Sequence, residues 1–220
     1  MMRSNETHTG RSRPAPQSIE RLGPKTLVLR EFALDRVGDL LPGIEQVISA
    51  ASFRNMITPG GFTMSVALTN CGALGWTTDE RGYRYTADDP ESGRPWPRMP
   101  HAFARVAREA AAEALFDDFE PDACLVNRYV PGSRLSLHQD KNERDYNAPI
   151  VSVSLGMTAT FLFGGHTRSD RPTTVPLRHG DVVVWGGEDR LRYHGVLALK
   201  GEPNPALGSQ RINLTFRKAG

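Results

Sequence analysis

The chain has 220 residues, of which 39% are hydrophobic, so it is long enough to bury one core and fits a single domain. Its 27 Lys and Arg residues nearly balance 25 Asp and Glu residues, which excludes a global electrostatic field as the basis of nucleic-acid binding and leaves only a local patch. Cys71 and Cys124 form no C-x-x-C pattern, which argues against a thiolate zinc site or a disulfide scaffold and predicts a cytoplasmic protein.

The first fifty residues combine a polar tail with two short regular elements. Residues 1–24 lack the apolar core of a secretory signal, so we expect a disordered tail. Residues 26–32, "TLVLREF", predict a strand. Residues 34–52 have helical spacing, with a break expected at Pro42-Gly43.

A long segment without a sustained period follows. Residues 62–70 predict a strand, whereas residues 71–98 carry several Gly, Pro and aromatic residues in no regular pattern. Irregular segments of this length are typical of functional lids or linkers, and the aromatic residues favour a lid. Residues 101–119 form an Ala-rich amphipathic pattern that predicts a helix.

The last hundred residues alternate short apolar runs with turns. We expect strands at residues 123–130, 150–156, 159–165, 181–187, 191–196 and 211–217. The uncharged run at residues 148–167 is long enough to raise the question of a membrane span, but its Ser, Thr and Gly residues favour two strands. Two helices followed by about six strands predict an α+β, mainly β fold: an antiparallel barrel or double-sheet jelly roll with helices on one side.

The stretch "LSLHQD" begins as a strand and then breaks its apolar alternation. In an extended chain His138 and Asp140 point to the same face, and a distant histidine such as His194 would complete the facial triad of non-haem iron(II) oxygenases. The alternative is a chance His-x-Asp pair in an ordinary strand. The other histidines are better explained structurally, because they lie in the tail, at a helix start and in turns: His8, His101, His166 and His179.

Two strands carry polar residues on one face. In "RINLTFR" the residues Arg211, Asn213, Thr215 and Arg217 alternate with apolar ones, which fits either a solvent-facing sheet or a clamp for a dicarboxylate. The strand "LVNRY" adds an amide and a phenol on one face, from Asn127 and Tyr129.

Four motifs together resemble a known family. "LGWTTDERGYRY", "NRYVPGSRLSLHQD", "GDVVVWGGEDRLRYHG" and "RINLTFR" are similar to segments of the AlkB family of iron(II)- and 2-oxoglutarate-dependent nucleic-acid demethylases, and especially of its bacterial members. The resemblance runs from about residue 63 to the C-terminus. It implies a double-stranded β-helix, or jelly-roll, core at about residues 122–217 and a nucleotide-recognition lid at about residues 63–98, within one domain at residues 25–220.

The resemblance also implies a set of site residues. Iron would be held by His138, Asp140 and His194. 2-Oxoglutarate would be held by Asn127, Tyr129, Arg211, Asn213 and Arg217, with Arg211 on the distal carboxylate and Arg217 near the carboxylate beside the keto group. The base and its phosphates would contact Trp76, Tyr83, Tyr85, Asn142 and Arg168.

The implied reaction uses iron(II), 2-oxoglutarate and O₂ to remove N-methyl groups from 1-methyladenine and 3-methylcytosine. The substrate would be single-stranded DNA, with RNA as a further candidate, and the enzyme a monomer. Asn142 stands where close family members often carry an acidic residue, which leaves the lesion preference open. Two alternatives remain: an oxygenase acting on a protein or small molecule, and a non-enzymatic jelly-roll binding module.

Overall fold

A computed structural model describes residues 16–220 of the protein. Its helices are α1 (Val37–Ala50) and α2 (His101–Glu113), with short 3-10 helices at Leu34–Arg36 and Gly187–Asp189. Its strands are β1 (Ser18–Gly23), β2 (Thr26–Arg30), β3 (Ala67–Gly72), β4 (Gly75–Asp79), β5 (Gly82–Thr86), β6 (Ala123–Tyr129), β7 (Leu135–His138), β8 (Ile150–Gly156), β9 (Ala159–Phe163), β10 (Thr173–Leu177), β11 (Val182–Trp185), β12 (His194–Val196) and β13 (Arg211–Arg217).

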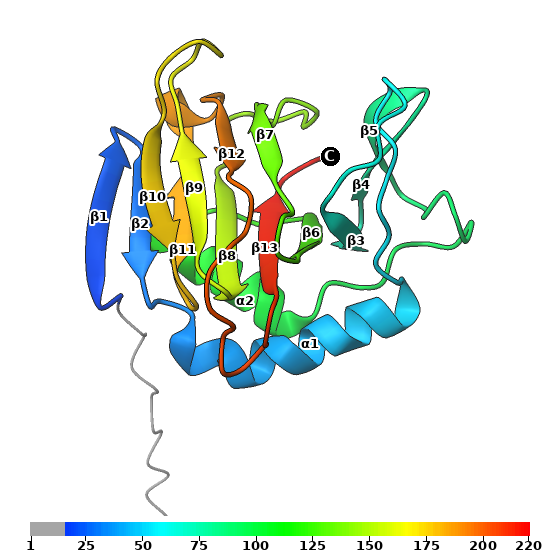
Figure 1. Ribbon diagram of the computed structural model, residues 1–220, viewed down its shortest axis with the longest axis horizontal. Coiled ribbons are helices and arrows are strands. Elements are labelled where there is room, and N and C mark those ends of the chain that lie inside the picture. Colours follow the sequence, from blue (N-terminus) through cyan, green and yellow to red (C-terminus); the bar gives the residue numbers. More distant parts are fainter. Residues whose placement is uncertain (1–15) are drawn as a thin grey trace, which may run out of the picture.

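The strands form two sheets and one separate hairpin. The larger sheet has seven strands in the order β1-β2-β11-β8-β13-β6-β3, and the smaller has four in the order β10-β9-β12-β7. Strands β4 and β5 pair only with each other and stand beside the sheets (Figure 1). Apolar residues of both sheets share one buried cluster, which includes Tyr129 and Trp185 of the larger sheet and Phe161 and Phe163 of the smaller. The predicted jelly-roll core is therefore confirmed.

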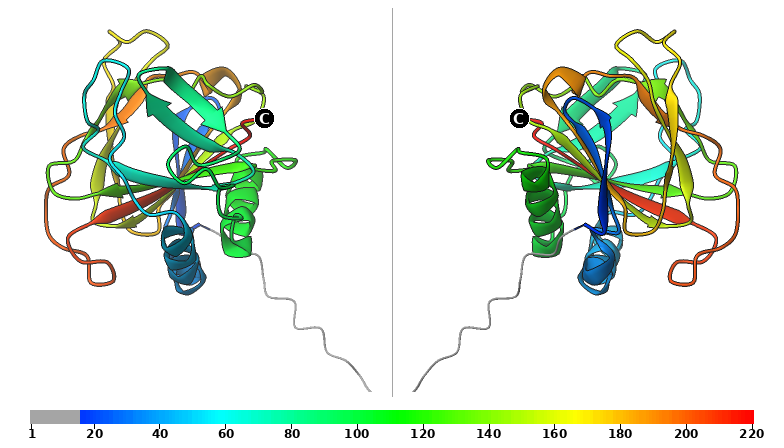
Figure 2. Two further views of the ribbon diagram at one scale, coloured as in Figure 1. Left: turned by 90° about the vertical axis from the view of Figure 1, so that its right-hand side faces the viewer. Right: turned by 90° about the vertical axis from the view of Figure 1, so that its left-hand side faces the viewer.

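Both helices cover the outer face of the larger sheet. Leu40 and Ile44 of α1 and Phe103 of α2 belong to one buried cluster with strand residues such as Val153 and Phe216. Figure 2 shows the two helices side by side beneath the sheets, which agrees with the expected arrangement of helices on one side. With its outer face covered in this way, the larger sheet presents its inner face to the smaller sheet.

Strand β13 lies between β8 and β6 and has all seven of its residues buried. Ile212, Leu214 and Phe216 pack toward the helices, so the alternate residues face the smaller sheet. The alternative interpretation, in which the polar residues of this strand face solvent, is therefore wrong. The register pairs Asn213 with Asn127 of β6, so the polar faces of both strands lie together.

Several expected boundaries need correction. Residues 18–23 of the expected tail form the edge strand β1, which pairs with β2, and residues 1–15 lie outside the described residues. The expected strand at residues 62–70 begins later, at Ala67, and the helix expected at residues 101–119 ends at Glu113. Strand β1 is thus an added edge strand, whereas the other two differences only shift the ends of expected elements.

Two larger differences have physical causes. Helix α1 continues through Pro42, because burial of Leu40, Ile44 and Val47 against the sheet outweighs the loss of about 3 kcal/mol that a proline causes inside a helix. Residues 71–98 contain the hairpin β4-β5, which cross-strand aromatic pairing stabilises. Within residues 16–220, no helix is long and apolar enough to cross a bilayer.

Candidate active site

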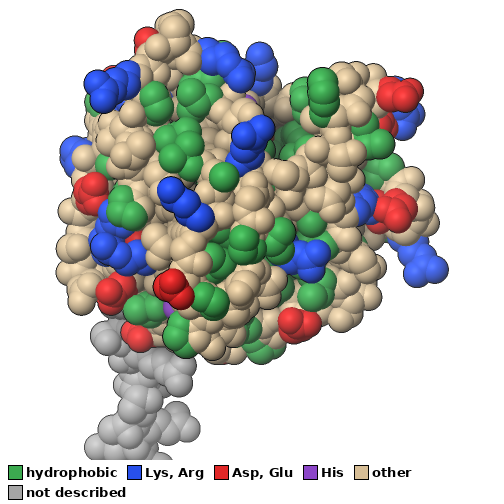
Figure 3. Space-filling model, in the orientation of Figure 1, with side chains coloured by type: hydrophobic (Ala, Val, Ile, Leu, Met, Phe, Trp, Pro, Cys, Tyr) green, Lys and Arg blue, Asp and Glu red, His purple; other side chains and the backbone are tan. Residues whose placement is uncertain are grey.

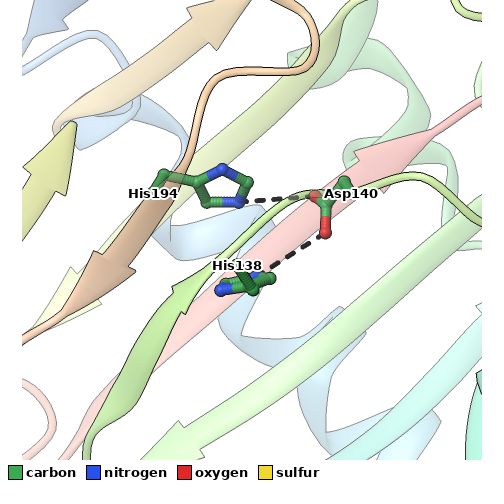
Figure 4. A group of neighbouring side chains, drawn as sticks. All are labelled: His138, Asp140 and His194. Carbon is green, nitrogen blue, oxygen red and sulfur yellow. Dashed lines mark ion pairs between the residues drawn. The ribbon is translucent and has the colours of Figure 1, made fainter. Parts of the chain in front are cut away.

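Three possible metal ligands meet at the ends of two neighbouring strands. His138 ends β7, His194 begins β12, and the two are register partners in the smaller sheet. Asp140 follows β7, and its Oδ1 and Oδ2 lie 3.7 Å from Nε2 of His138 and 3.6 Å from Nε2 of His194, respectively (Figure 4). The three possible ligand atoms all lie within 4.8 Å of one another, a spacing that one metal ion can bridge.

Backbone contacts orient both imidazoles for metal binding. Nδ1 of His138 lies 2.8 Å from the carbonyl oxygen of Ser136, and Nδ1 of His194 lies 3.0 Å from that of Arg192. Since a carbonyl oxygen only accepts, each Nδ1 carries the proton and each Nε2 presents its lone pair toward Asp140. Burial and, next, the neighbouring His194 lower the pKa of His138 to about 4, so the His138 ring is neutral at pH 7. Two imidazole nitrogens and one carboxylate are a ligand set that fits iron(II).

Arg217 holds the carboxylate of Asp140. Nη2 and Nε of Arg217 donate to Oδ2 of Asp140 at 2.6 and 3.0 Å, and both side chains are buried. Burial alone would raise the pKa of Asp140, but the positive charge of Arg217 outweighs it and holds this pKa well below its usual range. Asp140 is therefore ionised, as a metal ligand requires.

Arg211 has the features expected of a binding group for 2-oxoglutarate. Its side chain is 1% exposed, its Nη2 donates to Oγ of Ser154 at 2.9 Å, and its guanidinium lies 5.0 Å from the ring centre of Tyr129. Its Nε and Nη1 have no hydrogen-bond partner among residues 16–220. Burial lowers the pKa of Arg211, yet a guanidinium remains charged at neutral pH. A buried cation with unused donors fits a dicarboxylate, because guanidinium binds carboxylate in a bidentate manner.

Hydrogen bonds fix the amide next to this arginine. Nδ2 of Asn213 donates to Oγ of Ser152 at 2.8 Å and to the carbonyl oxygen of Val153 at 2.9 Å. Its Oδ1 accepts from Oγ1 of Thr215 at 2.9 Å. The wall between the metal ligands and Arg211 is therefore rigid and polar.

One cavity of about 790 Å³ brings nearly all the predicted site residues together. Its volume lies within the range typical of small-molecule sites. It is lined by twelve of the thirteen predicted residues: Trp76, Tyr83, Asn127, Tyr129, His138, Asp140, Asn142, Arg168, His194, Arg211, Asn213 and Arg217.

The rim of the cavity is aromatic and polar. Trp76 of β4 stacks on Tyr83 of β5 with ring centres 5.6 Å apart and planes inclined by 20°. Nε1 of Trp76 donates to Oδ1 of Asn142 at 3.3 Å. Arg168 is exposed and lies in the connection between β9 and β10. Figure 3 shows several Lys and Arg side chains in the upper part of the molecule, in the orientation of Figure 1. The rim thus offers ring faces together with nearby positive charge.

Tyr85 is the one predicted residue that does not line the cavity. It is the register partner of Trp76, but its hydroxyl donates to Oε1 of Glu143 at 2.6 Å and accepts from Nη1 of Arg217 at 3.3 Å. Burial raises the pKa of Tyr85 well above its ordinary value. In the free protein the Tyr85 hydroxyl thus belongs to a buried charged cluster, and its contact with the base and phosphates stays a prediction.

Glu143 and Arg190 belong to the same cluster, although no sequence pattern pointed to them. Both are buried, and Nη2 of Arg190 lies 3.1 Å from Oε2 of Glu143. Charged residues in a polar segment such as "DKNERDYN" are usually exposed. The one available signal was the position of Glu143 three residues after the ligand Asp140.

The fold and the site are those of an iron(II) and 2-oxoglutarate oxygenase. A sequence model of the 2OG-Fe(II) oxygenase superfamily matches residues 39–217. A solved structure described as that of OsALKBH1 is 30% identical, with a TM-score of 0.78, and the match covers 91% of this chain and 100% of that one.

Curated relatives narrow the assignment. The α-ketoglutarate-dependent dioxygenase AlkB of Salmonella typhimurium is 58% identical over 91% of this chain and 93% of its own length, and that of Escherichia coli is 54% identical over the same shares. The human nucleic acid dioxygenase ALKBH1 is 34% identical over 60% of this chain and 33% of its own length. This chain belongs to the AlkB family and is an iron(II)- and 2-oxoglutarate-dependent dioxygenase.

Proposed function

We propose that this chain repairs alkylated single-stranded DNA by oxidative demethylation of 1-methyladenine and 3-methylcytosine, with RNA as a further substrate. One observation carries the proposal: a three-ligand metal site, a buried arginine with unused donors and an aromatic rim converge on one cavity. The bacterial relatives are named α-ketoglutarate-dependent dioxygenases and the human relative a nucleic acid dioxygenase, which supports an oxygenase reaction on nucleic acid.

Each wall of the cavity has its own task in this proposal. His138, Asp140 and His194 hold iron(II), while Arg211 and Arg217 orient the carboxylates of 2-oxoglutarate, assisted by the amides and the phenol of Asn127, Tyr129 and Asn213 on the same sheet. When bound, iron with 2-oxoglutarate and O₂ supplies the oxidant that releases the methyl carbon as formaldehyde and leaves succinate and CO₂. The protein contributes position, charge and exclusion of water.

The aromatic rim serves as the platform for the damaged base. Trp76 is half-buried at the rim and His138 is partly exposed below it, so the base stacks between the two rings. Tyr83 and Arg168, at the edge of the cavity, contact the phosphates. A methyl group on the pairing edge weakens base pairing, which makes extrusion of the base less costly, and least costly in a single strand.

Asn142 reads the exocyclic amine of the base. Its Oδ1 already accepts from Nε1 of Trp76, so the same oxygen lies beside the proposed stacking platform. An amide oxygen accepts a hydrogen bond from an amine of either adenine or cytosine, but it adds no negative charge. We therefore propose that this position favours neither of the two lesions strongly.

The protein acts as a monomer in the cytoplasm in this proposal. Cys71 and Cys124 are free and buried, although they are register partners on β3 and β6, which is consistent with a reducing compartment.

The test is direct repair by the reconstituted enzyme. The protein is loaded with iron(II) under anaerobic conditions and then exposed to air with 2-oxoglutarate and an oligonucleotide that contains one 3-methylcytosine. We expect formaldehyde and restored cytosine in equal amounts, and neither product from Asp140→Ala. If the enzyme consumes 2-oxoglutarate but methylated oligonucleotide neither stimulates this turnover nor is repaired, the substrate is a protein or a small molecule and the proposal is wrong.

A further inference from the structure

Glu143 is a buried carboxylate that no step of the proposed reaction uses. It is 6% exposed, and both of its oxygens are engaged. Oε1 accepts from the Tyr85 hydroxyl at 2.6 Å and lies 3.4 Å from Nε of Arg217, while Oε2 lies 3.1 Å from Nη2 of Arg190. A carboxylate at this depth is stable only when paired and hydrogen-bonded, so its partners determine what it does.

The two cations beside Glu143 both hold Asp140. Nη1 of Arg190 donates to the backbone carbonyl oxygen of Asp140 at 2.7 Å, and Nη2 of Arg217 donates to its carboxylate at 2.6 Å. Arg190 is fixed further by the carbonyl oxygen of Ala148, at 3.1 Å from its Nε. Glu143 therefore lies behind both groups that set the position of the metal ligand.

The third partner of Glu143 comes from the hairpin at the rim of the cavity. Tyr85 lies on β5, and its cross-strand partner is Trp76, the proposed base platform. The hairpin pairs with neither sheet and lies beside β3 in Figure 1, where Asn70 of β3 accepts from the backbone N–H of Trp76 at 3.0 Å and donates to its carbonyl oxygen at 2.9 Å. The hydroxyl of Tyr85 thus joins the hairpin to the charged cluster behind the metal ligand.

We propose that Glu143 is a positioning residue that links the nucleotide-recognition hairpin to the metal ligand Asp140. The proposal rests on the proposed function for its nucleic-acid half, since it assigns Trp76 to the base. Docking of a base on Trp76 is transmitted through Tyr85 to Glu143 and through Arg217 and Arg190 to Asp140. Efficient turnover of 2-oxoglutarate therefore depends on a base bound at the rim of the cavity.

The charge of Glu143 also connects it to metal binding. Asp140 and Glu143 neutralise Arg217 and Arg190 before any metal binds, so the cluster as a whole is uncharged. Glu143→Gln keeps the size of the side chain but leaves one cation uncompensated next to the metal site. This excess positive charge disfavours a divalent cation and draws Arg217 more tightly onto Asp140.

Two measurements on the full chain test the proposal: one concerns the connection of Glu143 to the metal site, and the other its connection to the hairpin. Affinity for iron(II) is measured anaerobically from metal-dependent thermal stabilisation. Coupling is measured as the ratio of 2-oxoglutarate turnover with methylated oligonucleotide to turnover without it. We expect Glu143→Gln to weaken iron(II) binding roughly tenfold to a hundredfold, as changes behind a metal ligand do.

Tyr85→Phe tests the hairpin half, because it removes only a hydroxyl. We expect the coupling ratio to fall about tenfold, the factor that corresponds to one hydrogen bond with a charged partner. Two matched controls separate coupling from general stability. Glu109→Gln breaks the partly buried pair with Arg36 on the far side of the sheet, and Arg84→Gln breaks the pair with Asp79 within the same hairpin. Neither control should change the iron affinity or the coupling ratio.

Each outcome decides the proposal. Iron affinity that falls equally in Glu143→Gln and Glu109→Gln would make Glu143 a structural residue and overturn it, as would a coupling ratio that Tyr85→Phe leaves unchanged. If the wild type itself shows no stimulation by methylated oligonucleotide, the proposed substrate is wrong, while the comparison of Glu143→Gln with Glu109→Gln still decides the metal half. If Glu143→Gln does not fold, Tyr85→Phe against Arg84→Gln decides the link.

Discussion

Replacement of Arg211 by methionine should affect cosubstrate binding and protein stability in opposite directions. The guanidinium is 1% exposed, and its Nε and Nη1 lack a partner among the described residues. In the free protein it is a desolvated charge with one hydrogen bond to Ser154, at 2.9 Å. Methionine is unbranched, apolar and uncharged, so Arg211→Met removes the desolvation cost together with the binding group.

The expected magnitudes follow from the burial of this group. Breaking one side of a buried charged pair costs about 3–5 kcal/mol. At about 1.4 kcal/mol for each factor of ten, the Kd for 2-oxoglutarate should rise by roughly two to three and a half orders of magnitude. The free energy of unfolding without 2-oxoglutarate should stay the same or rise, since apolar replacement of an imperfectly paired buried charge is neutral or stabilising.

Urea unfolding measures both effects in the same samples. Wild type and Arg211→Met are unfolded anaerobically with manganese(II), with and without saturating 2-oxoglutarate. The wild type should gain stability from 2-oxoglutarate in proportion to RT ln(1 + [L]/Kd), and the variant should gain almost none. A variant that is less stable without 2-oxoglutarate yet is stabilised by it as strongly as the wild type would show that Arg211 is a structural cation, and the clamp would have to lie elsewhere.

Three further predictions concern the metal, the base platform and pH. Asp140→Ala should abolish demethylation at iron concentrations that saturate the wild type, because two histidines alone bind iron(II) weakly. Full activity of this variant at those iron concentrations would contradict the assignment of the three metal ligands. Trp76→Ala should lose about 1–3 kcal/mol of base stacking, seen as a fall of roughly one decade or more in kcat/KM for methylated oligonucleotide, and unchanged repair would remove Trp76 from the site. His179 has a pKa lowered by burial, and its Nδ1 accepts from the backbone N–H of Gly156 at 2.9 Å, so the folded state favours the neutral ring. The unfolded state therefore binds more protons, and the free energy of unfolding should fall as pH decreases below about 6.5; this loss should be smaller in His179→Gln, and an equal loss in both proteins would contradict the assignment.

Local patterns predicted the parts of the site that lie on regular strands. The alternation in "RINLTFR" placed Arg211, Asn213 and Arg217 on one face, and the structure shows that face turned toward the cavity. His138 and Asp140 were predicted to be close because an extended chain brings residues two apart to one side. The period of two therefore sufficed to group the residues, although which face lay inward depended on the second sheet.

The buried cluster behind the metal ligand could not be predicted in this way. Glu143 and Arg190 are charged residues in polar loop segments, and their burial depends on Tyr85 and Arg217 from distant parts of the chain. The same limit applies to the fold. Strand β10 contains Pro176 and exposed threonines, so it lacks a strand pattern and exists because β9 pairs with it.

The central position of β13 also has a consequence for folding kinetics. Arg217 and Asp140 are 77 residues apart in the chain, and Asn213 and Ser152 are 61 apart, so the walls of the cavity meet only when distant strands pair. Pairing of this kind has a high contact order and forms slowly. A transition state in which β13 has not yet docked lacks Arg211 and Asn213 in the cavity and cannot bind 2-oxoglutarate, so 2-oxoglutarate should slow unfolding while leaving the refolding rate unchanged.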